Sequence, residues 1–484
     1  MIHRYYNNGY YIVLDVNSGA VHVVDELAYE VIGLYESRAR EEIVEQLKDR
    51  WTEEEIREAL DDVEELKAQG TLFTEDTYKA QVIDFKKRST VVKALCLHIA
   101  HDCNLACRYC FAEEGEYHGR RALMSYEVGK QALDFLIANS GNRRNLEVDF
   151  FGGEPLMNWQ VVKDLVAYGR EQEKLHDKKF RFTLTTNGIL LNDEVQEFVN
   201  REMSNVVLSI DGRKEVNDKM RPFRNGHGSY DLIVPKFQKL AESRNQNNYY
   251  VRGTFTRNNL DFSEDVLHLA DLGFKQISVE PVVAAPEEPY AIREEDIPAL
   301  CEQYDKLAAE MVRRHGKEND FNFFHFMIDL TGGPCVYKRL SGCGSGTEYL
   351  AVTPWGDLYP CHQFVGNEKF LMGNVFDGVT NTELRDEFKC CNVYAKEKCQ
   401  KCFAKFYCSG GCAANSYNFH GSINDAYDIG CELQKKRVEC AIMIKAATAG
   451  LQTEAEDMRT ETEGLQEEAG EACAECGAAE CAQG

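Results

Sequence analysis

The sequence has no uninterrupted run of about 18 apolar residues, the length that a membrane-spanning helix requires. Its first residues also lack the apolar core and the small-residue cleavage site of a secretory signal peptide, so we expect a cytoplasmic protein. Basic side chains are in the minority: the chain has 55 lysines and arginines but 80 aspartates and glutamates, and its formal net charge is −25. A chain this acidic repels nucleic acid and anionic membranes, and we predict that neither is a partner.

The 484 residues include 19 cysteines, which are spread unevenly along the chain. Four of them precede Cys301, and most of the others lie between Cys335 and Cys440. A disulfide framework would require export, for which the sequence carries no signal. Because clustered cysteines in an intracellular chain more often bind metal, we expect metal or iron–sulfur sites.

Patterning and composition divide the chain into four parts. Residues 1–85 combine β-rich runs with amphipathic helical stretches, which predicts a small winged-helix-like module. Residues 90–320 alternate strand and helix patterns, which predicts an α/β fold with a parallel sheet, built as a partial (β/α)6 barrel. Residues 330–445 are rich in cysteine and weak in periodicity, and such loops are usually held by metal. Residues 452–484 contain 10 acidic residues and one basic residue, which predicts a disordered tail.

Individual elements can be predicted within the first two parts. The runs at 10–16 and 20–25 flank the turn signal NSG and predict two strands. We expect one helix over 25–47 and another that begins after Thr52, where Glu55 completes a capping box. Six runs predict the strands of the parallel sheet: 94–100, 146–151, 180–186, 206–210, 249–255 and 275–281.

A C-x3-C-x2-C motif follows the first predicted strand of this sheet and consists of Cys103, Cys107 and Cys110. Three thiolates suit three irons of a [4Fe–4S] cubane and leave the fourth iron open to a chelating amino and carboxylate group. Tyr109, just before the last cysteine, is placed to lie against a purine. A zinc site or three unrelated thiols are the alternatives, and the position directly after a strand favours the cluster.

Glycine and polar residues follow the next three predicted strands. Gly152 and Gly153 allow the backbone to approach a ligand closely, and Glu154 adds a negative charge. Asn187 ends the third strand and Ser209 the fourth. Because the carboxyl ends of barrel strands carry the chemistry, we expect these residues beside the cysteine loop, although such motifs are also ordinary turns.

These motifs, in this order, resemble the radical SAM superfamily. The resemblance implies that Cys103, Cys107 and Cys110 hold a [4Fe–4S] cluster that cleaves S-adenosylmethionine (SAM) to a 5′-deoxyadenosyl radical. It also implies that GGEP holds the amino group of SAM, and that Ser209 and Arg221 contact its ribose and carboxylate.

Seven further cysteines occur in the third part in the order C-x12-G-x4-C, then C-x2-C-x5-C-x3-C, then a last cysteine. This string resembles the SPASM extension of the superfamily, which implies two auxiliary [4Fe–4S] clusters and therefore three clusters in all. The outer cluster would be held by Cys399, Cys402, Cys408 and Cys431. The inner cluster would be held by Cys343, Cys361 and Cys412, with either Cys335 or a substrate thiolate in the fourth position. Structural zinc is the alternative.

The remaining cysteines of the second half fit no position of that pattern. Three of them are expected to be packed thiols: Cys390, Cys391 and Cys440. Three others lie in the acidic tail, as reactive thiols or an opportunistic metal site: Cys473, Cys476 and Cys481.

Residues 1–85 resemble the PqqD-like element that binds leader peptides, and the run at 10–16 is expected to offer an edge strand to such a peptide. A structural cap or dimerisation unit is the alternative. The three parts together resemble thioether-forming maturases of six-cysteine (SCIFF) peptides. This resemblance implies a ribosomal precursor peptide as substrate, an acceptor carbon on threonine, an electron donor such as ferredoxin or flavodoxin, and an anaerobic cytoplasm.

Two other functions compete with this interpretation. Sulfatase maturases, which make formylglycine, typically carry an acidic residue after the cysteine of G-x4-C, whereas this chain has His362 there. His362 is either a catalytic base or a polar loop histidine without a catalytic role, and the second interpretation is favoured. A non-catalytic electron-transfer or peptide-carrier protein would have no open iron, which the intact C-x3-C-x2-C and GGEP motifs disfavour.

Overall fold

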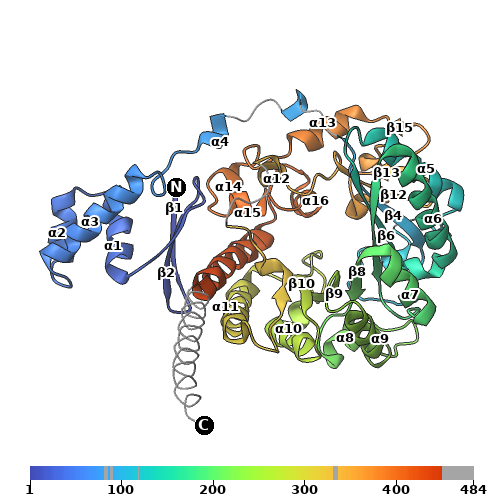
Figure 1. Cartoon of the computed structure of the whole chain (residues 1–484), viewed down its shortest axis with the longest axis horizontal. Coiled ribbons are helices and arrows are strands. Elements are labelled where there is room, and N and C mark those ends of the chain that lie inside the picture. Colours follow the sequence, from blue (N-terminus) through green and yellow to red (C-terminus); the bar gives the residue numbers. More distant parts are fainter. Residues whose placement is uncertain (81–84, 88–90, 118, 331–335, 450–484) are drawn as a thin grey trace, which may run out of the picture.

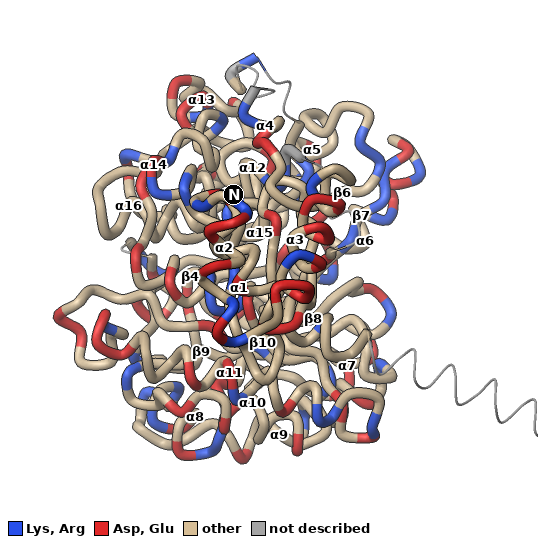
Figure 2. Tube along the Cα trace, turned by 90° about the vertical axis from the view of Figure 1, so that its left-hand side faces the viewer, with Lys and Arg blue, Asp and Glu red and all other residues tan. Residues whose placement is uncertain are grey.

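The computed structural model describes residues 1–80, 85–87, 91–117, 119–330 and 336–449 (Figure 1). The chain begins with a small module at one end of the molecule. Its antiparallel sheet has the order β1 (Ile2–Asn7), β2 (Tyr10–Asp15) and β3 (Val21–Val24). Three helices complete it: α1 (Glu26–Tyr35), α2 (Arg40–Leu47) and α3 (Glu53–Ala68). Figure 2 shows that acidic residues recur along these three helices.

The module differs from the sequence prediction in two ways. Residues 25–47 form two helices, because the amides of Ser37 and Arg38 both donate to Leu34 O and end the first one. The expected edge strand at 10–16 is the central strand β2, so the edges are β1 and β3. The capping box of Thr52 and Glu55 is confirmed at the start of α3.

A mostly parallel sheet forms the centre of the chain and contains all six predicted strands. In spatial order these are β4 (Ala94–His101), β6 (Asn145–Gly152), β7 (Lys179–Thr186), β8 (Met203–Ser209), β9 (Tyr249–Phe255) and β10 (Gln276–Pro281). Seven helices accompany them: α5 (Tyr126–Asn139), α6 (Trp159–His176), α7 (Asp193–Glu202), α8 (Lys214–Met220), α9 (Tyr230–Ser243), α10 (Phe262–Asp271) and α11 (Ile297–Arg314). Neighbouring strands in chain order lie side by side, as in a (β/α)6 arrangement.

The sheet extends beyond the six predicted strands. Short β11 (Asn322–Phe323) pairs with β10, and β12 (Tyr349–Val352) pairs in parallel with β4. Antiparallel strands continue from β12: β13 (Asp357–Tyr359), β14 (Gly373–Asn374) and β15 (Gly378–Val379). The two-residue β5 (Ala122–Leu123) pairs with β4. The cysteine-rich part is therefore joined to the central sheet through β12.

The two faces of this sheet differ in polarity. On β6, Val148 and Phe150 are fully buried in the core, whereas Asp149 between them is only partly buried. On β9, Val251 is fully buried and Arg252 is exposed. We call the polar side the inner face; helices α5, α6, α7 and α10 pack on the other side. A polar face that water can reach is suited to a polar substrate.

The cysteine-rich part is built from short helices and one long one. The short helices are α12 (Val336–Ser341), α13 (Thr382–Cys390), α14 (Glu397–Gln400), α15 (Lys405–Cys408) and α16 (Ala413–His420). A C-terminal helix follows, of which residues 428–449 are described. No helix in the described ranges has both the length and the apolar character needed to cross a bilayer.

Contacts between distant segments attach the module to this part. Tyr5 on β1 donates to Glu439 O in the C-terminal helix at 3.0 Å. Asp76, which precedes α4 (Thr77–Ala80), accepts hydrogen bonds from Tyr394 and Lys405, both at 2.8 Å. The first strand of the chain therefore packs against its last described helix, as Figure 1 shows.

Candidate active site

The first cysteine motif forms the loop that leaves β4 at the carboxyl edge of the parallel sheet. Burial raises the pKa of Cys103 to about 12 and that of Cys107 to about 11. The proximity of the other thiols, Cys110 among them, raises both pKa values further. The structure therefore brings the three predicted ligands together in one partly buried place.

Backbone hydrogen bonds hold this loop against the segment at the end of α8. The amide of Ala106 donates to Pro222 O, and the amide of Arg108 donates to Met220 O, both at 2.9 Å. The loop conformation is thus fixed by the chain itself, because these bonds involve no ligand.

The GGEP motif packs directly against the start of the same loop. Gly152 has φ +120°, and a Cβ there would lie 2.3 Å from Ala100 O; at Gly153 it would lie 2.1 Å from Asp102 O. The amide of Gly153 donates to Ala100 O at 2.7 Å, and that of Glu154 donates to Asp102 O at 2.9 Å. Only glycine permits this close approach of the two backbones.

Glu154 is fully buried, and its carboxylate is occupied by hydrogen bonds from the chain. It accepts from the Thr186 hydroxyl at 2.8 Å, the Asn187 amide at 2.8 Å and the Leu156 amide at 3.0 Å. Burial raises its pKa, and these three hydrogen bonds oppose the shift. Its observed role is to link the ends of β6 and β7, with Asn187 held beside the loop.

Tyr109 and Arg221 meet at a residue that the sequence analysis did not select, Asp211. The Tyr109 hydroxyl donates to Asp211 Oδ1 at 2.7 Å and accepts from Arg221 Nη1 at 2.9 Å. Burial raises the pKa of Asp211 to about 6. Its place just after Ser209, in the Ser-Ile-Asp-Gly motif that ends the fourth strand, was the signal that could have identified it.

Buried polar atoms without a partner occur beside this cluster of side chains. Among the described residues, Arg221 Nε and Asn104 Nδ2 are buried and make no hydrogen bond. Asn187 Nδ2 donates to Asn104 Oδ1 at 2.7 Å and lies 3.7 Å from Cys103 Sγ. Unsatisfied donors next to three gathered thiols fit a polar ligand at this position, because leaving them unpaired costs free energy.

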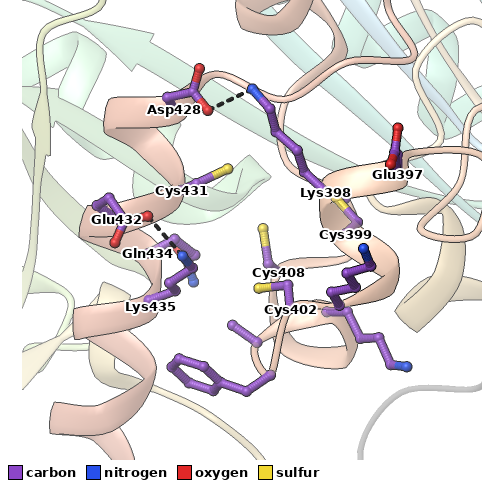
Figure 3. A pocket seen from close by; sticks show the side chains of 15 residues that line it. Glu397, Lys398, Cys399, Cys402, Cys408, Asp428, Cys431, Glu432, Gln434 and Lys435 are labelled. Carbon is purple, nitrogen blue, oxygen red and sulfur yellow. Dashed lines mark hydrogen bonds and ion pairs between the residues drawn. The ribbon is translucent and has the colours of Figure 1, made fainter.

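The four cysteines predicted for the outer cluster line one cavity of about 480 Å³. Cys399 comes from α14, Cys408 from α15, Cys402 from between them and Cys431 from the C-terminal helix. Figure 3 shows the sulfur atoms of Cys402, Cys408 and Cys431 directed toward a common space. Burial, followed by the neighbouring thiols, raises the pKa of Cys408 to about 11 and that of Cys431 to about 12. Four converging thiols fit a fully ligated cluster.

The three cysteines predicted for the inner cluster also lie near one another. Burial raises the pKa of Cys361 to about 12, with further contributions from Cys412 and Cys343. Cys391, which we expected to be a packed thiol, lines the same small cavity as Cys343, and Cys343 contributes to its raised pKa after burial. Sequence spacing gave no signal for this neighbour. Cys335 lies outside the described residues.

The other cysteine predictions have mixed outcomes. Cys440 is fully buried, which confirms a packed thiol, and Cys390 is partly buried. The three tail cysteines lie outside the described residues.

Within the described ranges, no three His, Cys, Asp or Glu side chains converge on a single metal-ion position. A cubane binds each thiolate at a different iron, so its ligands stand farther apart than those of one ion.

His362 lies on the inner-face side of the molecule, in aromatic surroundings. Its ring centroid is 5.7 Å from that of Phe111 and 5.1 Å from that of Phe151. Burial lowers its pKa to about 4, so it is neutral at pH 7. Ser209 ends β8 and is half-buried.

Comparison with known proteins gives matches over most of the chain. A family described as "4Fe-4S single cluster domain" matches residues 92–235. The radical SAM cyclopropyl synthase TigE of Paramaledivibacter caminithermalis is 21% identical over 364 residues, 71% of this chain and 72% of TigE. The cysteine-type anaerobic sulfatase-maturating enzyme of Clostridium novyi is 23% identical over 355 residues, 70% of this chain and 92% of that enzyme. The structure of Streptococcus suis SuiB bound to precursor peptide SuiA has a TM-score of 0.52 and 16% identity, and the alignment covers 89% of this chain and 98% of SuiB.

Proposed function

We propose that this chain, whose matches support the radical SAM/SPASM-type family, forms thioether bonds in a ribosomally made, cysteine-rich precursor peptide. The bond would join a cysteine sulfur to a carbon of an acceptor residue, threonine. The observation that carries the proposal is the gathering of Cys103, Cys107 and Cys110 beside unpartnered buried donors at the carboxyl edge of the sheet. Three thiols leave one iron of a [4Fe–4S] cluster for SAM.

The residues around this loop have separable roles in the proposal. The three thiolates would hold the cluster, which with SAM supplies a 5′-deoxyadenosyl radical that takes a hydrogen atom from the substrate. Arg221 would bind the carboxylate of SAM through its free Nε, and Asp211 holds that arginine in place through Tyr109. Gly152 and Gly153 would expose backbone groups to the amino group of SAM. The tight backbone contacts keep these groups oriented before a ligand arrives.

The two other groups of cysteines support a SPASM-type extension with two auxiliary clusters. Four thiols around one cavity suit a closed outer cluster, and three suit an inner cluster with one position left open. In the proposal a substrate thiolate takes that position, where binding to metal lowers its pKa.

The module of residues 1–85 would bind the leader of the precursor peptide. Because β2 is central and β1 packs on the C-terminal helix, β3 is the edge open to an added strand. Deleting the module should weaken peptide modification while sparing SAM cleavage without peptide; equal modification would refute its recognition role. An electron donor such as ferredoxin or flavodoxin would supply the reducing electron.

Formylglycine formation is the second candidate, favoured by the match to a sulfatase-maturating enzyme. This chain offers His362 where those enzymes typically carry an acidic residue. The two products differ chemically: a thioether loses two hydrogen atoms and keeps its sulfur, whereas formylglycine made from cysteine loses the sulfur.

The test uses protein purified without oxygen and supplied with SAM and dithionite. We expect 5′-deoxyadenosine, iron–sulfur absorbance and a spectral change on addition of SAM. With a cysteine-rich peptide encoded beside the gene, mass spectrometry should show the loss of two hydrogens for each bridge. A chain without iron–sulfur absorbance, or with a peptide product that has lost sulfur, would refute the thioether proposal.

A further inference from the structure

A second cavity, of about 260 Å³, opens where the inner face of the sheet meets the cysteine-rich part. Glu280 at the end of β10 and Arg437 of the C-terminal helix line it. Cysteines of both predicted auxiliary groups line it too: Cys412 of the inner group and Cys408 and Cys431 of the outer group. A ligand in this cavity would therefore lie next to the auxiliary centres.

Arg437, which lines this cavity, has an unfilled hydrogen-bonding position. Its Nε donates to the Tyr304 hydroxyl at 2.9 Å, and the residue is only 8% exposed. Its Nη2 is buried and has no hydrogen-bond partner among the described residues. A buried charged donor without a partner is costly, so such a group usually serves an acceptor that arrives with a ligand.

Glu280 supplies an acceptor in the lining of the same cavity. Its carboxylate accepts from Arg252 Nη2 at 3.1 Å, and 38% of the side chain remains accessible. Burial alone would raise its pKa, but Arg252, His325 and Arg437 outweigh that effect and hold the pKa at about 2. Glu280 is therefore ionised throughout the physiological range and has lone pairs to offer a ligand.

We propose that Arg437 and Glu280 bind the backbone of the substrate peptide beside the auxiliary centres. A guanidinium donor and a carboxylate acceptor facing one cavity match the C=O and N–H of a peptide chain. An anionic ligand would be repelled by Glu280, and a cation by Arg437 and Arg252, so a neutral amide is the favoured occupant. This inference rests on the proposed peptide-modifying function and adds a binding site for the segment that is modified.

The test measures the binding of a blocked peptide, acetyl-Ala-Cys-Ala-Thr-Ala-amide, to the full chain with its clusters in place. Arg437→Lys keeps the positive charge but removes Nη2, so the dissociation constant should rise by about 10-fold, as for one lost hydrogen bond to a charged group. Glu280→Gln should also weaken binding and serves as the second test if Arg437→Lys lowers the melting temperature. Tyr304→Phe is the matched control, because it removes the internal partner of Arg437 and leaves Nη2 intact.

The outcomes separate this inference from the proposed function. Weaker binding by both cavity variants, with Tyr304→Phe within about two-fold of the native chain, supports the site. Native-like binding by Arg437→Lys and Glu280→Gln overturns it, as does an equal loss in Tyr304→Phe or no binding to the native chain. SAM cleavage without peptide is measured in the same samples; its absence in the native chain would instead contradict the radical SAM assignment.

Discussion

The loop around Cys103 and the cavity around Cys431 both gather thiols, but the chain supports them in different ways. The first lies on a long parallel sheet, and its backbone is fixed by bonds to Pro222 and Met220. The second is bounded by α14 and α15, which have four residues each, and by one face of the C-terminal helix. Helices this short are marginal by themselves. The comparison indicates that the first site is formed by the fold, whereas the second depends on what its thiols bind.

The strongest test of this contrast is Cys107→Ala. Loss of one of three ligands should abolish 5′-deoxyadenosine formation, while the melting temperature of the barrel changes little because the sheet does not depend on the thiol. Product is measured by chromatography after incubation with SAM and dithionite. Cys301→Ala, a partly buried cysteine outside the motifs, is the control and should keep activity. Normal product from Cys107→Ala would contradict the ligand assignment.

The second-largest effect is expected from removing the iron, which should affect the region of Cys431 far more than the central sheet. After anaerobic chelation, we expect amide hydrogen exchange to rise strongly across residues 399–431, because metal binding and folding are coupled there. Exchange in β6 and β7 should stay slow, since buried apolar side chains such as Phe150 and Phe182 hold them. Equal loss of protection in both regions would contradict the idea that only the second region depends on bound metal.

A smaller effect should follow from changing the polar network of the first site. Asp211→Asn removes the charge that orients Tyr109 and Arg221, and SAM affinity should fall by about 10-fold, the cost of one weakened charged hydrogen bond. Iron content should stay at the native level, because Asp211 is not a ligand in our proposal. The measurement is titration with SAM followed by the cluster spectrum. Loss of iron together with affinity would show that the network holds the cluster instead.

The smallest predicted effect concerns Asp149 on the inner face. Burial, with Glu147 nearby, raises its pKa from 3.8 to about 6, so the folded state binds its proton more tightly than the unfolded chain. The stability that this proton adds to the folded state is fully present below pH 3.8 and is lost as the pH rises through 6. Asp149→Asn should therefore be more stable than the native chain at pH 7.5, and this gain should be smaller at pH 5. Urea unfolding at both pH values measures this; equal stability of the variant and the native chain at pH 7.5 would contradict the prediction.

The sequence predicted the six central strands because their apolar runs are long and separated by helical patterns. It did not predict that β12 joins β4, because four residues at the edge of a cysteine-rich segment give almost no periodic signal. It placed residues 10–16 at an edge, whereas the order of strands in a sheet depends on pairing that local patterns do not encode. Arg437 was missed for the same reason: the residues around it, Tyr304 and Glu280, are distant in the sequence.

The contact between β1 and the C-terminal helix has a consequence for how the chain is made. His3 Nε2 donates a hydrogen bond to Glu439 Oε1 at 2.9 Å across a sequence separation of 436 residues. During synthesis β1 leaves the ribosome long before the C-terminal helix has been made. The side of β1 that contacts this helix is therefore exposed to water, or covered by another protein, until the helix forms. Contacts of such high separation also form slowly. We therefore expect β1 to dock on the C-terminal helix late in folding, whereas the helices of the amino-terminal module have an apolar core of their own.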